Sequence, residues 1–281
     1  MKLFVENLNN VDVSFVDAKR GLVGESWMAG IMLTGKLDNQ SMICDFGVVK
    51  RCAKNWLDEF IDHRLVVPTQ MAGMHISKHD ALVTVRFPFP NGGEFVCSAP
   101  EQAFCFIDCD EINVDSVSTW LAEQLNNVIP GDIQDLAVSL KTEVIDGAFY
   151  HYSHGLKKHD GNCQRIAHGH RSKLEIFVEN KRDSALEKQW ATQWTDIYIG
   201  TQEDLHNQTQ IQGIEHNHYR YTAPQGEFSL TIPSSACYDI ETDSTVEQIA
   251  QHIANTLGQQ HPDVLVKAFE GIGKGAIASY E

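Results

Sequence analysis

The chain repeats its own sequence pattern in one order, and this repeat limits the possible folds more than any other feature. The matching segments are "SFVDAKRGL" (14–22) with "AFYHYSHGL" (148–156), "VGESWMAGIMLTG" (23–35) with "HGHRSKLEIFVEN" (168–180), and "LKTEVIDGAFYHY" (140–152) with "AFEGIGKGAIASY" (268–280). A repeat of roughly 135 residues is too long for a solenoid and fits two fused copies of one domain. We therefore expect a first copy at residues 1–147 and a second copy at residues 148–281.

Each copy has the pattern of an α+β domain. Alternating apolar residues in "SWMAGIML" and "SKLEIFVEN" indicate strands that bury one face. Apolar stripes in "FGVVKRCAKNWLDEFI", "DSVSTWLAEQL" and "STVEQIAQHIANTL" indicate amphipathic helices, and Asp, Ser or Thr caps precede the last two. We expect two tandem units, each an antiparallel sheet with helices packed on one face.

Composition and charge restrict the partners of the chain. Its 281 residues carry a formal net charge of −16, which argues against nucleic acid or an anionic membrane as the main partner. The first residues lack the apolar core of a signal peptide, and no run approaches the length of a membrane span. The seven cysteines show no C-x-x-C spacing, so we expect reduced thiols in a cytoplasmic protein.

A cluster of histidines in the second copy indicates a metal site. His168 and His170 flank a glycine at the start of a strand pattern, where residues two apart point to the same face. His154 lies on the preceding strand, and a loop with a glycine can fold it back beside them. Three imidazoles suit zinc with an open fourth position; the alternative is a histidine-rich surface loop. Cys163 lies between them as either a fourth ligand or a general base.

The first copy lacks this cluster but has a different pair of polar residues. Asp62 and His63 follow a predicted helix, either as a helix end with a surface histidine or as an acid–base pair. Glu143 and Glu270 occupy matching places at the ends of the two copies, and a carboxylate there can bind the N–H edge of a pterin or guanine ring. Aligned on the repeat, the three histidines fall against Arg20, Val23 and Glu25. These complementary differences predict one composite site per chain.

The motifs together resemble a known family, that of 6-pyruvoyltetrahydropterin synthase and 6-carboxytetrahydropterin synthase, which share the tunnelling fold (T-fold). The family pattern is F-x-A-x-H-x-L, C-x(3–5)-H-G-H, D-F, D-H, T-x-E and a late glutamate. The second copy matches in "FYHYSHGL", "CQRIAHGH", "STVEQIA" and "AFEGIGKGA", and the first copy in "MICDFG" and "EFIDHRL". A tyrosine replaces the family's alanine, and the second copy lacks D-F and D-H.

The resemblance implies a role for each matching residue. His154, His168 and His170 would bind one zinc ion per chain, and Cys163 would be the base that abstracts a proton. Asp62 and His63 would assist proton transfer, and in family members this pair comes from a neighbouring subunit. The expected substrate-binding residues are Glu270, which also joins the proton relay, Glu143 as its competitor for the pterin ring, Thr245 and Arg165.

The implied function is that of a zinc-dependent lyase. It would convert 7,8-dihydroneopterin triphosphate to 6-carboxy-5,6,7,8-tetrahydropterin with release of triphosphate and acetaldehyde, in the biosynthesis of queuosine and other deazapurines. The alternatives are 6-pyruvoyltetrahydropterin synthase activity and a non-catalytic, zinc-containing pterin-binding protein. T-fold sheets close by assembling several copies around a ring or barrel, so a homo-oligomer is expected.

Overall fold

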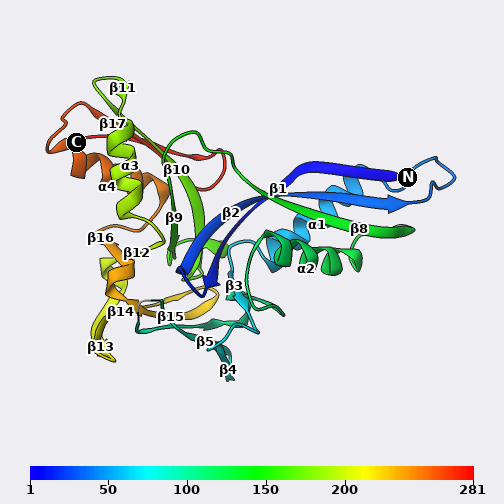
Figure 1. Ribbon diagram of the computed structural model, residues 1–281, viewed down its shortest axis with the longest axis horizontal. Helices are drawn as coiled ribbons and strands as arrows, with labels where there is room; N and C mark the ends of the chain where they lie inside the picture. The colour runs from blue at the N-terminus through cyan, green and yellow to red at the C-terminus, as the bar shows by residue number, and fades with distance from the viewer. Residues whose placement is uncertain (91) are drawn as a thin grey trace.

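The computed structural model describes residues 1–90 and 92–281, which form an α+β protein with three sheets (Figure 1). The first sheet has the strand order β7-β3-β1-β2-β8, and its two longest strands form an antiparallel hairpin. β3 pairs in parallel with both β1 and β7. The bounds are β1 Lys2–Asp17, β2 Gly21–Gly35, β3 Leu65–Pro68, β7 Phe104–Ile107 and β8 Ile133–Thr142.

The second sheet repeats this arrangement with strands from the second half of the chain. Its order is β16-β12-β9-β10-β17-β18, and β12 again pairs in parallel with both of its neighbours. The short strand β11 pairs with the far end of β10. The bounds are β9 Phe149–His154, β10 His168–Val178, β11 Lys181–Arg182, β12 Ile197–Thr201, β16 Cys237–Ile240, β17 Val264–Phe269 and β18 Gly275–Ser279.

The third sheet joins the two halves, with the order β13-β14-β15-β6-β5-β4. Its centre is the antiparallel pair of β6 with β15, in which Cys97 lies opposite Leu230. The apolar side chains beneath this sheet come from both halves and form one shared core. The bounds are β4 His75–His79, β5 Leu82–Pro88, β6 Glu94–Pro100, β13 Leu205–Ile211, β14 Ile214–Ala223 and β15 Gly226–Pro233.

Helices cover one face of the first and second sheets (Figure 1). Each begins after a capping side chain that accepts a backbone N–H, and the caps are Asp45, Asn113, Asp183 and Thr245. None of the helices in residues 1–90 and 92–281 is long and apolar enough to span a membrane. The bounds are α1 Phe46–Phe60, α2 Val114–Asn126, α3 Ser184–Gln193 and α4 Val246–Gly258.

The first and second sheets approach each other closely at two glycines. The Ser14 hydroxyl lies 2.6 Å from the Ser153 hydroxyl, across the boundary between the halves. A Cβ atom on Gly24 would lie 1.9 Å from the carbonyl oxygen of Tyr152, and one on Gly169 would lie 2.3 Å from the same oxygen. Only glycine permits this backbone contact. The contact brings β1 and β2 of the first half against the strands that carry the histidine cluster.

Candidate metal centre and acid–base pair

Three buried histidines meet where β9 ends and β10 begins. The antiparallel register of the two strands places His154 directly opposite His168, and His170 follows two residues later on β10. Their side chains are at most 1% exposed. One ring nitrogen from each lies within 4.8 Å of the other two. These three residues, called the histidine triad below, form a group of the size that one metal ion requires.

Two of these rings are oriented by backbone carbonyls of the second half. Nδ1 of His154 lies 2.9 Å from the carbonyl oxygen of Ser244, and Nδ1 of His168 lies 2.9 Å from that of Arg165. A carbonyl oxygen only accepts hydrogen bonds, so each Nδ1 must carry the proton. This tautomer leaves the lone pair on Nε2, which is the atom available to a metal.

The triad is suited to a divalent transition metal such as zinc. Among the described residues, none of the three Nε2 atoms has a hydrogen-bond partner, although all three are buried. Burial, together with the neighbouring imidazoles, lowers the pKa of His154 to about 3 and that of His168 well below its ordinary value. Neutral, buried imidazoles without partners are unusual unless they bind a ligand, and three of them match a catalytic zinc site.

Cys163 lies beside the triad rather than within it. It belongs to a short 3₁₀ turn, Asn162–Gln164, in the loop between β9 and β10. Its sulfur, a ring nitrogen of His63 and a ring nitrogen of His168 all lie within 4.8 Å of one another. The thiol therefore lies near both the triad and the acid–base pair, where either a ligand or a base could act.

The Asp62–His63 pair of the first half reaches this centre within the same chain. Nδ1 of His63 lies 2.6 Å from Oδ2 of Asp62, and the His63 ring centroid lies 5.2 Å from that of His168. His63 has φ of 55°, a left-handed conformation that turns the chain sharply after α1. Burial alone would lower the pKa of His63, but the contacts with Asp62 and Cys163 outweigh it and raise that pKa to about 10.

Arg165 donates hydrogen bonds to the backbone of this pair. The residue is 4% exposed, and its Nη1 atom lies 3.3 Å from the carbonyl oxygen of Asp62 and 3.4 Å from that of His63. Its Nε atom donates to the side chain of Gln225 at 3.1 Å. Burial lowers the pKa of Arg165 to about 10. The guanidinium therefore holds the backbone of Asp62 and His63, in addition to the substrate role expected from the sequence.

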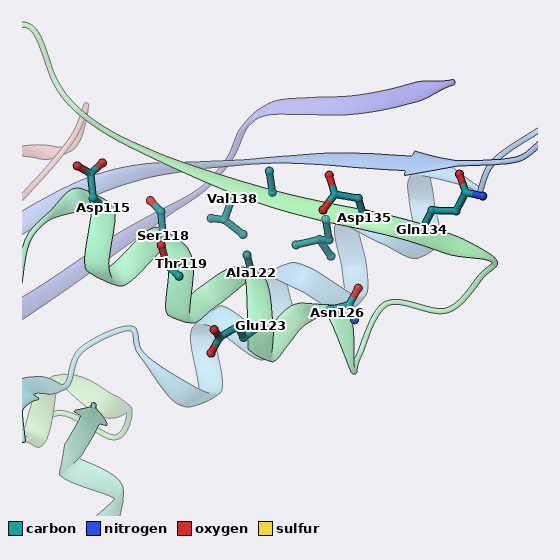
Figure 2. A pocket seen from close by; sticks show the side chains of 11 residues that line it. Asp115, Ser118, Thr119, Ala122, Glu123, Asn126, Gln134, Asp135 and Val138 are labelled. Atoms are coloured by element: carbon teal, nitrogen blue, oxygen red, sulfur yellow. The ribbon is translucent and has the colours of Figure 1, made fainter. Parts of the chain in front are cut away.

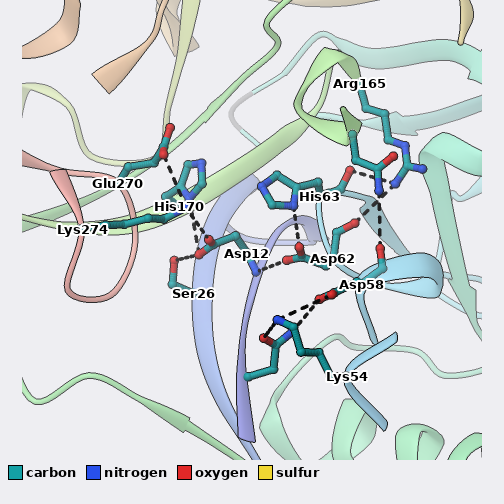
Figure 3. Close-up of polar contacts among 12 residues, drawn as sticks. Asp12, Ser26, Lys54, Asp58, Asp62, His63, Arg165, His170, Glu270 and Lys274 are labelled. Carbon is teal, nitrogen blue, oxygen red and sulfur yellow. Dashed lines mark hydrogen bonds and ion pairs between the residues drawn. The ribbon is translucent and has the colours of Figure 1, made fainter. Parts of the chain in front are cut away.

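Asp12 of β1 is a site residue that the sequence reasoning missed. Its carboxylate is 3% exposed and lies 3.4 Å from Nδ1 of His170, 3.6 Å from Nζ of Lys274 and 2.5 Å from the Ser26 hydroxyl (Figure 3). Burial alone would raise the pKa of Asp12, but His170 and Lys274 outweigh it and lower that pKa. A lone acid within the apolar strand "VDVSF" was the available signal, because Asp is rarely buried without a partner.

The two candidate glutamates lie in different surroundings. Glu270 follows β17, and its carboxylate lies 3.4 Å from Nζ of Lys274. Burial would raise its pKa, but His170 and Lys274 outweigh it and lower that pKa. Glu143 follows β8; its carbonyl oxygen accepts from Arg171 at 2.8 Å, and its buried Oε2 has no partner within residues 1–90 and 92–281. Of the two, Glu270 is the one beside the triad.

Thr245 has a structural contact of its own. It caps α4, where its hydroxyl accepts from the backbone N–H of Gln248 at 3.4 Å. The preceding residue, Ser244, is the one whose carbonyl oxygen faces His154. Thr245 therefore fixes the start of the helix next to the residue that orients one triad member.

The strand registers correct one correspondence between the halves. In the first half Ser14 lies opposite Gly24, and the next pair is Phe15 with Val23. In the second half Ser153 lies opposite Gly169, and the next pair is His154 with His168. The counterpart of His154 is therefore Phe15, and not Arg20 as the sequence alignment gave. The alignment placed the length difference too late in the hairpin, because the β9–β10 loop is longer than the β1–β2 turn. Arg20 instead forms an ion pair with Asp196 at 2.5 Å. Phe15, Val23 and Glu25 cannot bind zinc as the triad can.

A surface groove lies away from this centre. It has a volume of about 680 Å³ and lies between α2 and β8 (Figure 2). Its lining includes the carboxylates of Asp115, Glu123 and Asp135, and it contains no residue of the triad or of the acid–base pair. Volume alone therefore does not locate the chemistry, which depends on the convergent buried groups at the β9–β10 junction.

The comparisons with known proteins match one family. Its sequence model, described as 6-pyruvoyl tetrahydropterin synthase, matches residues 143–279. The chain is similar to the solved structure of 6-pyruvoyl tetrahydropterin synthase from Plasmodium vivax, with 16% identity and a TM-score of 0.43 over 52% of this chain and 93% of that chain. The chain is also similar to the 6-pyruvoyl tetrahydropterin synthase of Plasmodium falciparum, with 14% identity and a TM-score of 0.42 over 50% of this chain and 90% of that chain. No curated protein sequence matches the chain.

Proposed function

Because residues 143–279 match the sequence model of the 6-pyruvoyl tetrahydropterin synthase family, we propose that the protein is a zinc-dependent lyase acting on 7,8-dihydroneopterin triphosphate. The observation that carries the proposal is the buried histidine triad, whose Nε2 atoms have no partner among the described residues, beside a paired acid and base. The family supplies the substrate class, and the geometry supplies groups able to move protons next to a metal.

The proposed product is 6-carboxy-5,6,7,8-tetrahydropterin, formed with consumption of water and release of triphosphate and acetaldehyde. This reaction would place the protein in the biosynthesis of queuosine and other deazapurines. The second candidate product is 6-pyruvoyltetrahydropterin, which the same family description names. The two differ in whether the substrate side chain is cleaved, so the identity of the released fragments distinguishes them.

The residues divide the proposed reaction between them. The triad holds one zinc ion, which would polarise the side-chain oxygens of the substrate and make the adjacent C–H groups more acidic. Sγ of Cys163 takes a proton from that carbon, and Nε2 of His63 exchanges a proton with a substrate oxygen. Asp62 keeps His63 in position and stabilises its charged form. Glu270 accepts the N–H edge of the pterin ring, with Glu143, Thr245 and Arg165 as further substrate contacts.

The same proposal includes two domains and an oligomer. The strands β16-β12-β9-β10-β17 of the second sheet follow the same order as β7-β3-β1-β2-β8 of the first, which supports a division into units 1–147 and 148–281. Two observations support a ring of several chains: exposed apolar residues such as Phe4 and Met32 on β1 and β2, and the open edges at β8 and β18. Light scattering on purified protein tests this, and a stable monomer would remove the ring from the proposal.

The test of the function is turnover with defined products. Zinc-loaded protein is incubated with 7,8-dihydroneopterin triphosphate, and triphosphate, acetaldehyde and the pterin product are measured by mass spectrometry and enzymatic assay. Cys163→Ala should retain zinc and lose activity by at least about a hundredfold. Cys52→Ala, which removes a partly buried thiol of α1, is the matched control and should keep full activity.

Each outcome of this test has a distinct meaning. Acetaldehyde with a carboxylated pterin supports the proposed reaction, whereas triphosphate without acetaldehyde indicates the pyruvoyl product. Stoichiometric zinc with pterin binding but no turnover would indicate a non-catalytic pterin-binding protein. A Cys163→Ala variant as active as the wild type would remove the thiol from the mechanism.

A further inference from the structure

We propose that Asp12, a residue of the first half, is the positioning residue for the metal ligand His170. The inference rests on the proposed zinc site and adds a function for a side chain outside the family-matched segment, residues 143–279. Asp12 would fix the tautomer and orientation of His170 and increase its strength as a ligand. It would thereby make zinc binding in the second half depend on the first half.

The contacts of the Asp12 carboxylate fit this role. Oδ1 lies 3.4 Å from Nδ1 of His170 and accepts from the Ser26 hydroxyl at 2.5 Å, while Nζ of Lys274 lies 3.6 Å from Oδ2. Nδ1 of His170 has no hydrogen-bond partner of ordinary geometry among the described residues. The carboxylate is therefore the acceptor available to the Nδ1 proton, which leaves the Nε2 lone pair for the metal.

The other two ligands are oriented differently. His154 and His168 both direct Nδ1 at backbone carbonyls within the second half. Among the three, and within residues 1–90 and 92–281, only His170 has a ring nitrogen within 4.0 Å of a carboxylate oxygen, and that oxygen belongs to Asp12 of the other half. A charged acceptor increases the basicity of an imidazole more than a neutral carbonyl does, so the three ligands are not equivalent. We expect His170 to be the ligand whose strength depends on the first half.

The backbone of Asp12 connects the same residue to the acid–base pair. Its N–H donates to Oδ1 of Asp62 at 2.8 Å, and its carbonyl oxygen accepts from the N–H of His63 at 2.7 Å. Asp12 therefore contacts a metal ligand through its side chain and both members of the pair through its backbone (Figure 3). A side-chain substitution leaves these backbone bonds in place. The two contributions can therefore be separated by experiment.

The chain contains its own control for this contact. The strand registers match the two hairpins residue by residue: Asp12 lies opposite Ser26, and His151 lies opposite Arg171. His151 is therefore the counterpart of Asp12, and Glu25 is the counterpart of His170. The corresponding contact is that of His151 with Glu25, at 3.9 Å. It too pairs a carboxylate from the first half with an imidazole from the second, and Glu25 is 8% exposed. Glu25→Gln therefore removes a similarly buried carboxylate from the corresponding contact, which involves no member of the triad.

The experiment measures metal binding without substrate. Zinc dissociation constants of wild type, Asp12→Asn, Asp12→Ala and Glu25→Gln are determined by competition with a chromogenic chelator. Asp12→Ala should lose 10- to 100-fold in zinc affinity, the usual effect of removing such a partner. Asp12→Asn keeps an accepting oxygen and should lose less, and Glu25→Gln should match the wild type. The visible spectrum of Co²⁺-loaded protein should change in the Asp12 variants only.

Kinetics separate this role from that of the acid–base pair. At limiting zinc, the Asp12 variants should lose activity that added zinc restores, whereas Asp62→Asn should bind zinc normally and have a low kcat at any zinc concentration. Asp12 variants that unfold at lower temperature but keep wild-type zinc affinity and cobalt spectrum would overturn the inference. In that case wild-type zinc binding and turnover would still support the proposed function. Wild-type protein that binds no zinc would overturn both.

Discussion

Replacement of Glu25 by glutamine should stabilise the protein, and by more at high pH than at low pH. Glu25 is 8% exposed, and burial raises its pKa from 4.5 to about 7, although Arg171, Arg20 and the Ser26 backbone N–H act in the opposite direction. The folded state therefore disfavours the ionised carboxylate. Glutamine can still accept from the Ser26 N–H and carries no charge at any pH.

The sign and size follow from the difference between the folded and unfolded states. Well below pH 4.5 the carboxyl is protonated in both the folded and the unfolded state, so it does not affect the free energy of unfolding. Between pH 4.5 and 7 the unfolded state ionises and the folded state stays largely protonated, so the free energy of unfolding falls as the pH rises. A pKa raised by this amount lowers the free energy of unfolding by about 3 kcal/mol at pH values above 7. Glu25→Gln should therefore add less than about 1 kcal/mol at pH 5 and about 3 kcal/mol at pH 8.

Urea unfolding of metal-free protein at pH 5 and pH 8 measures this difference. Glu227→Gln is the control, because that carboxylate is 57% exposed beside Arg220 and its replacement should change stability equally little at both pH values. A Glu25→Gln effect that is the same at pH 5 and pH 8 would refute the reasoning. It would show that the carboxylate is solvated, or fully compensated by the two arginines, in the folded protein.

Three further predictions concern the site and the contact between the halves. Asp62→Asn should lower kcat by about a hundredfold or more without changing zinc affinity, measured by steady-state assay and chelator competition; an unchanged kcat would remove the pair from the mechanism. Gly169→Ala should destabilise the protein by roughly 2 kcal/mol, because its Cβ would lie 2.3 Å from the carbonyl oxygen of Tyr152; a wild-type melting temperature would contradict the close packing. Removal of zinc by a chelator should lower the melting temperature, and zinc but not magnesium should restore it; a melting temperature insensitive to chelator would argue against a bound metal.

Parts of the site followed from local sequence because strand periodicity determines them. The H-G-H spacing on a strand pattern predicts two imidazoles on one face, and the structure places His168 opposite His154 in the same hairpin. The repeat likewise predicts two related units, and five strands of the second sheet follow the strand order of the first.

Other parts depended on how distant segments pack, which no local pattern encodes. Asp12 reaches His170 only because the two sheets meet at Gly24 and Gly169. Whether the Asp62–His63 pair serves its own chain was open in the sequence, and the structure shows its ring beside His168 of the same chain. The counterpart of His154 was misassigned to Arg20, because hairpin loop length cannot be aligned without the strand register.

The β6–β15 pairing joins the two halves in a single continuous sheet at their junction. In the proposed mechanism neither half carries all of the reactive groups, so we expect a chain truncated at the midpoint to be inactive. Two such fragments produced together should recover activity when they reassociate through that central strand pair. Selection would then act on the two copies as one inherited unit, in which neither is free to become a separate enzyme.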